Sequence, residues 1–252
     1  MPAPNVLVVA NWKNNASLAD AAVLANGTRN CLEDLEGVDV VLCPPAVWLV
    51  PVHEHTASVP NLSVGLQDIS AHPEGPYTGE IAASLVRGLA RYTIIGHSER
   101  QFLYRETVER LQEKVRAALT EKITPIICIG EERRSTAALA QLARRLGHIV
   151  RPFTVKERGR LVVAFEPIWA ISKGKAPAQA ATPEYANDAA AALRGVLAAE
   201  TKILYGGSVT AANVASFITQ PEIAGVLVGG ASLKLREFTT IIKNAARAGQ
   251  PT

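Results

Sequence analysis

Short apolar segments alternate with longer amphipathic segments along almost the whole chain, and this alternation strongly constrains the fold. We predict eight strands, at residues 6–10, 38–43, 62–66, 92–95, 124–129, 161–165, 203–205 and 225–228. Between them lie helical patterns such as residues 108–119, in which Val108, Leu111, Val115 and Leu119 recur at helical spacing. Further helices are predicted over residues 185–199 and, after the last strand, over residues 235–248.

The spacing of these segments indicates eight consecutive βα units. Lys13 and Gly229 follow the first and last predicted strands, so seven units span them at about 31 residues each. Continuous apolar strands are typical of a parallel sheet that is covered on both faces. Closure into a (β/α)8 barrel suits eight such units. A doubly wound open sheet is the alternative, but no GxGxxG follows the first strand. Because no linker or composition break interrupts the pattern, we predict an α/β protein in which residues 1–252 form a single domain.

Composition excludes several classes of function. Apolar residues make up 48% of the chain, and the net charge of +3 comes from interspersed rather than clustered residues. This distribution argues against nucleic-acid binding and suits a small anionic substrate. The three cysteines form no CxxC pair, which indicates neither a disulfide framework nor a zinc site. No segment approaches the roughly 18 apolar residues of a membrane span. We therefore expect a cytoplasmic protein without nucleic-acid or membrane partners.

Two proton-handling side chains directly follow predicted strands. His97 lies in the run Gly-His-Ser-Glu-Arg after residues 92–95, and Glu166 follows the apolar residues 161–165. The carboxyl ends of parallel strands are where such enzymes build their sites. A buried carboxylate is costly unless it is used or paired, so Glu166 is a candidate base. With an imidazole nearby, it suits proton abstraction next to a carbonyl. Ser98 is the predicted N-cap of a helix that begins near Glu99, and this helix terminus would favour a neutral His97.

Other strand ends carry groups that suit an anionic substrate. Asn11-Trp12-Lys13 follows the first strand, where an ammonium group can stabilise negative charge on oxygen. Glu99 either orients this lysine or is only a first-turn acid that favours the helix dipole. The last two strands end in Gly206-Gly207-Ser208 and Gly229-Gly230. Paired glycines there let backbone N–H groups approach a phosphate.

The segment after Glu166 has the features of a lid. It exposes Ile168, Trp169 and Ile171 directly after the candidate base, and such side chains can cover a pocket when a loop closes. A statically packed loop is the alternative. The predicted lid comprises Pro167, Ile168, Trp169, Ala170, Ile171, Ser172, Lys173, Gly174, Lys175, Ala176 and Pro177.

Seven motifs in order along the chain resemble those of the triosephosphate isomerase family. They are Asn11-Trp12-Lys13, Gly79-Glu80, residues 96–100 (GHSER), residues 128–131 (CIGE), residues 165–171 (FEPIWAI), residues 205–209 (YGGSV) and residues 228–234 (VGGASLK). The resemblance covers almost the whole length of the chain.

This resemblance implies a TIM barrel that interconverts dihydroxyacetone phosphate and D-glyceraldehyde 3-phosphate through an enediolate, without a cofactor or a metal. It implies that Glu166 is the base, that neutral His97 polarises the carbonyl and moves protons between the two oxygens, and that Lys13 and Asn11 stabilise the enediolate. The implied catalytic set also includes Glu99. The implied phosphate-binding residues are Ser172, Gly207, Ser208, Gly229 and Gly230. Closure of the lid should suppress elimination of phosphate from the enediolate.

Residues 75–80 resemble the loop through which members of the family form homodimers. The resemblance implies a homodimer held through Tyr77, Thr78 and Gly79, with Thr78 reaching the neighbouring site near Asn11 and Glu99.

The chain departs from the family pattern at four places. Ser172 replaces a glycine of the lid, Pro177 lies close to a hinge, and Gln101 stands where a second arginine is usual. Residues 132–135 replace the usual continuation of the CIGE motif. None of these departures affects Lys13, His97 or Glu166. Two alternatives remain beside the triose reaction: isomerisation of a four-carbon ketose phosphate such as erythrulose phosphate, and a non-catalytic barrel that binds sugar phosphates.

Overall fold

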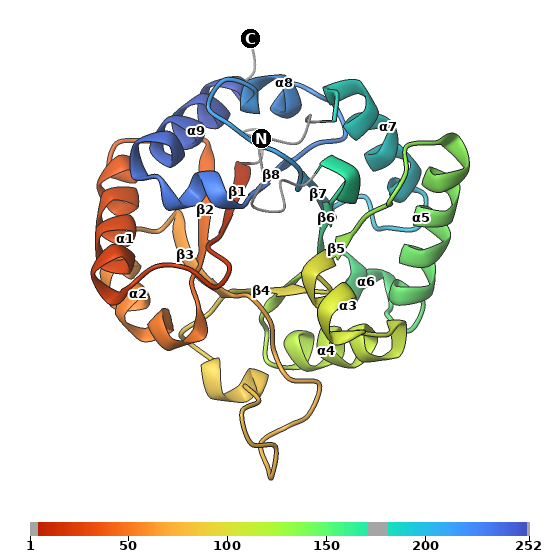
Figure 1. Ribbon diagram of the computed structural model, residues 1–252, viewed down its shortest axis with the longest axis horizontal. Coiled ribbons are helices and arrows are strands. Elements are labelled where there is room, and N and C mark those ends of the chain that lie inside the picture. The colour runs from red at the N-terminus through yellow and green to blue at the C-terminus, as the bar shows by residue number, and fades with distance from the viewer. Residues whose placement is uncertain (1–4, 171–180, 251–252) are drawn as a thin grey trace.

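The computed structural model describes residues 5–170 and 181–250, and the strands in these ranges form a closed parallel barrel (Figure 1). In chain order the strands are β1 (Val6–Asn11), β2 (Val38–Cys43), β3 (Leu62–Leu66), β4 (Tyr92–Ile95), β5 (Thr124–Ile129), β6 (Val162–Phe165), β7 (Lys202–Tyr205) and β8 (Gly225–Val228). Each strand pairs with the next along the chain, and β8 pairs with β1 to close the ring. The predicted (β/α)8 barrel is therefore confirmed, and the alternative of an open sheet is excluded.

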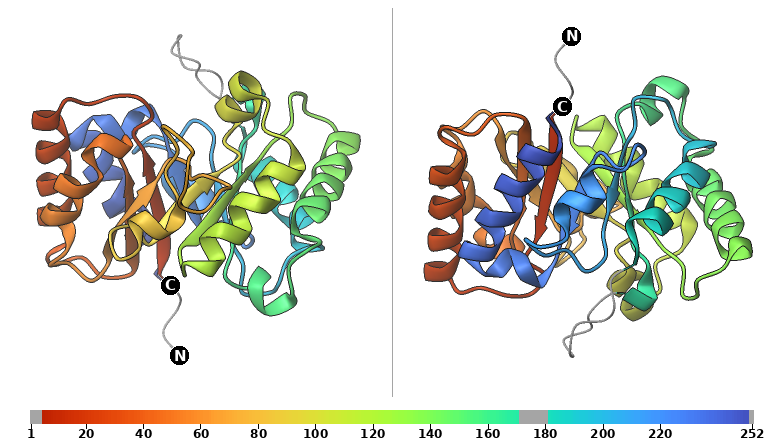
Figure 2. Two further views of the ribbon diagram at one scale, coloured as in Figure 1. Left: turned by 90° about the horizontal axis from the view of Figure 1, so that it is seen from below. Right: turned by 90° about the horizontal axis from the view of Figure 1, so that it is seen from above.

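Helices surround the barrel (Figure 2). They are α1 (Leu18–Leu32), α2 (Leu49–Thr56), α3 (Ser98–Tyr104), α4 (Val108–Thr120), α5 (Thr136–Val150), α6 (Val155–Arg158), α7 (Pro183–Arg194), α8 (Val214–Ile218) and α9 (Leu235–Ala248), with 3₁₀ turns η1 (Ala46–Trp48), η2 (Ala83–Val86), η3 (Ile168–Ala170) and η4 (Gly230–Leu233). One buried apolar layer lies between strands and helices, and a smaller one fills the barrel. Because strand side chains alternate between these two layers, every strand can be apolar throughout.

The prediction of a helix over residues 185–199 is wrong at both ends. The helix α7 begins at Pro183, where the Thr182 hydroxyl accepts a hydrogen bond from the backbone N–H of Tyr185. It ends at Arg194, and Gly195 is its C-cap. The apolar pattern continues through Val196 and Leu197, which pack against the core from two tight turns rather than from a helix.

The connection between β3 and η2 projects outward beyond the ring of helices (Figure 1). Its residues 74–80 are exposed. Across residues 5–170 and 181–250, no helix combines the length and apolar character needed to cross a membrane. Within the same ranges, no three His, Cys, Asp or Glu side chains gather closely enough to hold a metal ion.

Candidate active site

Glu166 follows β6, and its backbone is held between the neighbouring strands. Its N–H donates to the carbonyl of Ile129 at 2.8 Å. A Cβ atom on Gly130 would lie 1.7 Å from the carbonyl oxygen of Glu166, and one on Gly206 would lie 2.9 Å from its Cγ. The close approach thus requires residues without a side chain directly after both neighbouring strands, β5 and β7. The Glu166 side chain is only 2% exposed.

His97 and Glu166 are in direct contact. Nε2 of His97 lies 3.2 Å from Oε1 of Glu166, while the backbone N–H of Ser98 donates to Oε2 at 3.2 Å. Nδ1 of His97 accepts a hydrogen bond from the backbone N–H of Glu99, also at 3.2 Å. A ring nitrogen that accepts carries no proton, so this geometry indicates a neutral imidazole with its proton on Nε2.

The N-cap of α3 is His97, and the prediction that Ser98 takes this position is wrong. The imidazole Nδ1 supplies the acceptor that serine, threonine or aspartate usually provides at a helix start. Glu99 lies in the first turn of the helix, as predicted. The capping bond also fixes the orientation of the imidazole ring toward Glu166.

The structure also brings Lys13 and Glu99 together. Nζ of Lys13 lies 2.6 Å from Oε1 of Glu99, a contact through which the glutamate can orient the lysine. Lys13 has a left-handed backbone with φ of 53°, and its N–H donates to Oδ1 of Asn11. The side chain of Gln67 donates to the carbonyls of Lys13 and Cys43, at 2.7 and 3.0 Å.

The glycine pairs after β7 and β8 have different surroundings. A Cβ atom on Gly207 would lie 2.2 Å from the Tyr205 hydroxyl, so this position admits only glycine. A Cβ on Gly229 would lie 3.7 Å from Cε of Lys13, and one on Gly230 would meet no atom of the described part of the chain within 4 Å. The backbone at Gly229 and Gly230 therefore lies beside the Lys13 side chain and next to open space. This arrangement suits an anion.

The first part of the predicted lid is anchored to Glu131. The indole N–H of Trp169 and the Tyr185 hydroxyl both donate to Oε1 of Glu131, at 2.9 and 3.0 Å. Burial raises the pKa of Glu131, and these two bonds only partly offset that effect. Burial and the adjacent Glu131 raise the pKa of Tyr185. The hydroxyl of Ser208 donates to the carbonyl of Ala170 at 2.8 Å.

Tyr205 contacts the chain after the predicted lid. Its hydroxyl accepts a hydrogen bond from the N–H of Ala181 at 3.2 Å. Burial raises the pKa of Tyr205 to about 12, so the hydroxyl stays protonated. Ser208 and Tyr205 thus contact the two flanks of the predicted lid. The other predicted lid residues lie outside the described residues, namely Ile171, Ser172, Lys173, Gly174, Lys175, Ala176 and Pro177.

Three contacts of this region were not expected from the sequence. Gln67 holds the loop of Lys13, Glu131 anchors Trp169, and Gln101 contacts the residue before His97. Gln67 directly follows β3, so the rule used for the other strand ends would have selected it. The contact between Glu131 and Trp169 joins residues 38 positions apart and leaves no local signal. The contact between Gln101 and Gly96 spans only five positions, but it depends on the turn at Gly96.

A closed (β/α)8 barrel with polar side chains gathered at the carboxyl ends of its strands defines this protein as a TIM-barrel enzyme. The model of the triosephosphate isomerase family matches residues 6–245. The triosephosphate isomerase of Sodalis glossinidius (strain morsitans) is 39% identical over 97% of this chain and 98% of its own length. That of Leifsonia xyli subsp. xyli (strain CTCB07) is 42% identical over 94% of this chain and 96% of its own. The chain belongs to the triosephosphate isomerase family, which confirms the resemblance, and it is an isomerase.

Proposed function

We propose that this enzyme interconverts dihydroxyacetone phosphate and D-glyceraldehyde 3-phosphate through an enediolate, with Glu166 as the base and His97 as the electrophile. The observation that carries the proposal is the contact between a buried Glu166 carboxylate and the Nε2–H of a neutral imidazole, 3.2 Å apart. Glu166 takes the proton from one carbon of the substrate and returns it to the adjacent carbon. The two electrons of the broken C–H bond form the enediolate double bond, and no oxidant is needed.

His97 acts on the substrate oxygens in this proposal. Its Nε2–H donates a hydrogen bond to the carbonyl oxygen, which stabilises the negative charge that develops there. A neutral imidazole can then transfer protons between the two oxygens of the enediolate. The contact with Glu99 N–H supports this role because it keeps the proton on Nε2. Lys13, oriented by Glu99 and supported by Asn11, stabilises the same negative charge.

The phosphate group binds at the glycine-rich ends of β7 and β8. Open space beside the Gly230 backbone and the nearby Lys13 side chain support this placement. Gly207, Ser208, Gly229 and Gly230 line this end of the barrel, and Ser172 completes the proposed set. Closure of the lid over the bound substrate excludes water and suppresses elimination of phosphate.

The proposal includes a homodimer formed through Tyr77, Thr78 and Gly79. Two observations support it: the loop projects from the barrel (Figure 1), and α3 exposes the large apolar side chains of Phe102, Leu103 and Tyr104. Tyr77, Thr78 and Tyr104 line one cavity of about 610 Å³. A second copy would cover these apolar side chains. We also propose that the enzyme works in the cytoplasm, since Cys31, Cys43 and Cys128 are free thiols.

The experiment that tests the reaction compares kcat/KM of the purified protein for glyceraldehyde 3-phosphate and for erythrulose phosphate. We expect a value for the triose that approaches the ceiling of about 10⁸ M⁻¹s⁻¹ and a much lower value for the four-carbon substrate. Faster turnover of erythrulose phosphate would overturn the proposed substrate. Tight binding of triose phosphate without turnover would overturn the proposed chemistry and leave a binding protein.

A further inference from the structure

The helix that carries His97 at its start is held to the protein by polar contacts rather than by packing. The seven residues of α3 include no buried side chain. Phe102, Leu103 and Tyr104 are 84%, 64% and 66% exposed. A helix normally takes its orientation from the apolar face that it buries. In α3 the polar side chains of Arg100 and Gln101 must supply the attachment.

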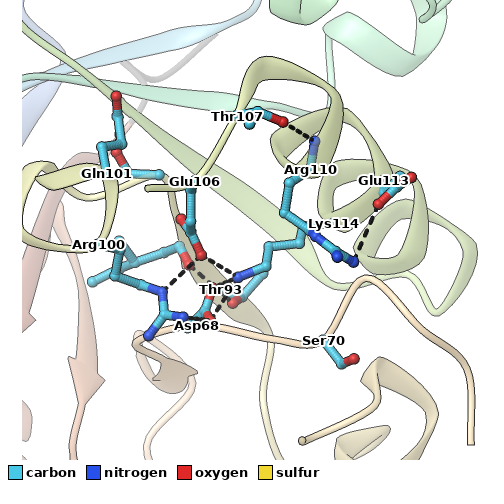
Figure 3. A network of polar contacts seen from close by, with 12 residues as sticks. Asp68, Ser70, Thr93, Arg100, Gln101, Glu106, Thr107, Arg110, Glu113 and Lys114 are labelled. Carbon is cyan, nitrogen blue, oxygen red and sulfur yellow. Dashed lines mark hydrogen bonds and ion pairs between the residues drawn. The ribbon is translucent and has the colours of Figure 1, made fainter. Parts of the chain in front are cut away.

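Arg100 attaches one side of the helix. Its guanidinium forms ion pairs with Asp68 and Glu106, each at 2.9 Å, and Lys114 contacts the same two carboxylates (Figure 3). Gln101 turns away from this cluster (Figure 3). The two neighbouring residues thus extend in different directions, and together they determine how α3 is oriented.

Gln101 holds both peptide groups that flank His97. Its side-chain N–H donates to the carbonyl of Gly96, and its backbone N–H donates to the carbonyl of His97 at 3.1 Å. Gly96 has a left-handed backbone with φ of 70°, where a side chain would be strained and would also meet Leu111 at 3.0 Å. The chain therefore turns sharply just before the imidazole, and the Gln101 amide holds this turn.

The far end of the Gln101 amide is held by α5. The guanidinium of Arg145 donates to Oε1 of Gln101. Within residues 5–170 and 181–250, Arg145 forms no ion pair with a carboxylate, so Gln101 is a main partner of its half-buried charge. Burial lowers the pKa of Arg145, in agreement with a guanidinium that lacks a compensating anion.

We propose that Gln101, held in place by Arg145, is a positioning residue that orients the Nε2–H of His97 for catalysis. The expected effect on catalysis rests on the proposed function, in which the Nε2–H of His97 acts on the substrate. Glutamine suits the position because its amide offers one donor to Gly96 and one acceptor to Arg145. A glutamate would offer only acceptors. An arginine would offer only donors and would place a second positive charge against Arg145.

Four variants and one matched control test this proposal. Gln101→Leu removes both contacts, Gln101→Glu keeps the side-chain volume but loses the donor to Gly96, and Arg145→Met leaves Gln101 without its partner. Arg145→Lys keeps a positive donor. Arg144→Met is the control, because Arg144 is the exposed neighbour of Arg145 on α5. The measurements are kcat, KM and the ¹⁵N resonances of the His97 ring in the substrate-free protein.

We expect kcat to fall on the order of tenfold in Gln101→Leu, Gln101→Glu and Arg145→Met, with KM nearly unchanged, because the reacting groups are misoriented rather than lost. The His97 resonances should shift in the same three variants. Arg145→Lys should retain most of kcat, and Arg144→Met should match the wild type. Gln101→Glu and Arg145→Met preserve side-chain bulk, so the comparison does not depend on the folding of Gln101→Leu.

The opposite result would be that Gln101→Leu, Gln101→Glu and Arg145→Met have lower melting temperatures than the wild type. Their kcat and their His97 resonances would then equal those of Arg144→Met. Gln101 would then serve stability alone, and the proposal would be wrong. If the wild-type protein has no isomerase activity, the proposed function fails, but the resonances still decide whether Gln101 and Arg145 orient His97.

Discussion

The imidazole of His97 and the carboxylate of Glu166 are in direct contact, with 3.2 Å between Nε2 and Oε1. The same Nε2–H must donate to a substrate oxygen in the proposed reaction. Substrate binding therefore has to move Oε1 of Glu166 away from Nε2 of His97. Oε2 of Glu166 accepts a hydrogen bond from the Ser98 N–H, and the carboxylate loses this bond when it moves toward the substrate.

Replacement of the base, Glu166→Gln, should lower kcat by a factor of about 10² to 10⁴. The amide has nearly the same size and can still accept the hydrogen bond from the Ser98 N–H, so the fold should persist, but it cannot take a proton from carbon. A coupled assay measures the rate, and calorimetry with a non-reacting triose phosphate analogue measures binding, which should be retained. Glu132→Gln, at an exposed position after β5, is the control. Undiminished activity in the Glu166 variant would contradict the mechanism.

Replacement of Gly230 by alanine should weaken substrate binding without destabilising the protein. The new methyl group meets no atom of residues 5–170 and 181–250 within 4 Å, so it enters the space proposed for phosphate. We expect KM to rise about tenfold, as for the loss of one charged hydrogen bond worth about 1.5 kcal/mol. Gly195→Ala is the matched control, since that methyl would also be accommodated but lies at the C-cap of α7. An unchanged KM would place the phosphate elsewhere.

Loss of the Glu131 carboxylate should release the first part of the predicted lid. In Glu131→Ala, Trp169 and Tyr185 lose their shared acceptor, whereas Glu131→Gln keeps an amide oxygen in its place. The alanine variant should lower kcat/KM and release more inorganic phosphate per turnover, because an open site permits elimination. The glutamine variant should remain close to the wild type. Phosphate release can be measured with a colorimetric assay, and equal release by both variants would argue against this anchor.

The contribution of Glu106 to stability should depend on pH. Burial opposes its ionisation, but hydrogen bonds from Lys114 and Arg100 outweigh burial and lower the pKa of Glu106. A lowered pKa in the folded state stabilises the protein above the unfolded value of about 4.3, and this stabilisation is lost as the pH falls through the folded pKa. Urea unfolding at pH 7 should therefore give Glu106→Gln a free energy of unfolding about 2 kcal/mol below that of the wild type. This difference in the free energy of unfolding between the wild type and Glu106→Gln should shrink below about pH 4.

Asp68 provides a contrast within the same cluster, because burial outweighs Lys114 and Arg100 there and raises the pKa of Asp68. A raised pKa contributes stability that is present at low pH and lost as the pH rises through the folded pKa. The stability of the wild type relative to Asp68→Asn should thus decline with rising pH. The same sign of pH dependence in both variants would show that the two carboxylates titrate as one unit.

A charge in the projecting loop should dissociate the proposed homodimer. Thr78→Arg introduces an unpaired guanidinium where a second copy would bury it, and sedimentation equilibrium should then show monomers. Val155→Arg on α6 is the control, because Val155 is a comparably exposed side chain at another surface. A wild-type protein that is monomeric at micromolar concentration would contradict the dimer.

The barrel was predictable because each strand is a short apolar run between turns. Five strands have the predicted bounds, and the other three differ by one residue at one end. The end of α7 was not predictable from periodicity, since Val196 and Leu197 continue the apolar pattern after the backbone has left the helix. Packing against the core explains these residues equally well in a helix or in a turn.

The candidate site was predictable where a polar residue directly follows a strand, as for His97 and Glu166. The capping of α3 was not, because the sequence offers two neighbouring acceptors, the His97 ring and the Ser98 hydroxyl, and only the backbone geometry decides between them. Gln101 and Arg145 are 44 residues apart, so their contact exists only once α3 and α5 pack on the barrel.

Because α3 buries no side chain, the enzyme can lose its activity while the barrel stays folded. Since burial of apolar surface provides most of the free energy that resists local opening, this helix belongs to the part of the single chain that unfolds at the least cost, wherever a second copy does not cover it. Heating or denaturant should then detach α3 while the strands remain paired. The enzyme would lose its activity in a molecule that is still mostly native, and cooling would restore it without refolding of the whole chain.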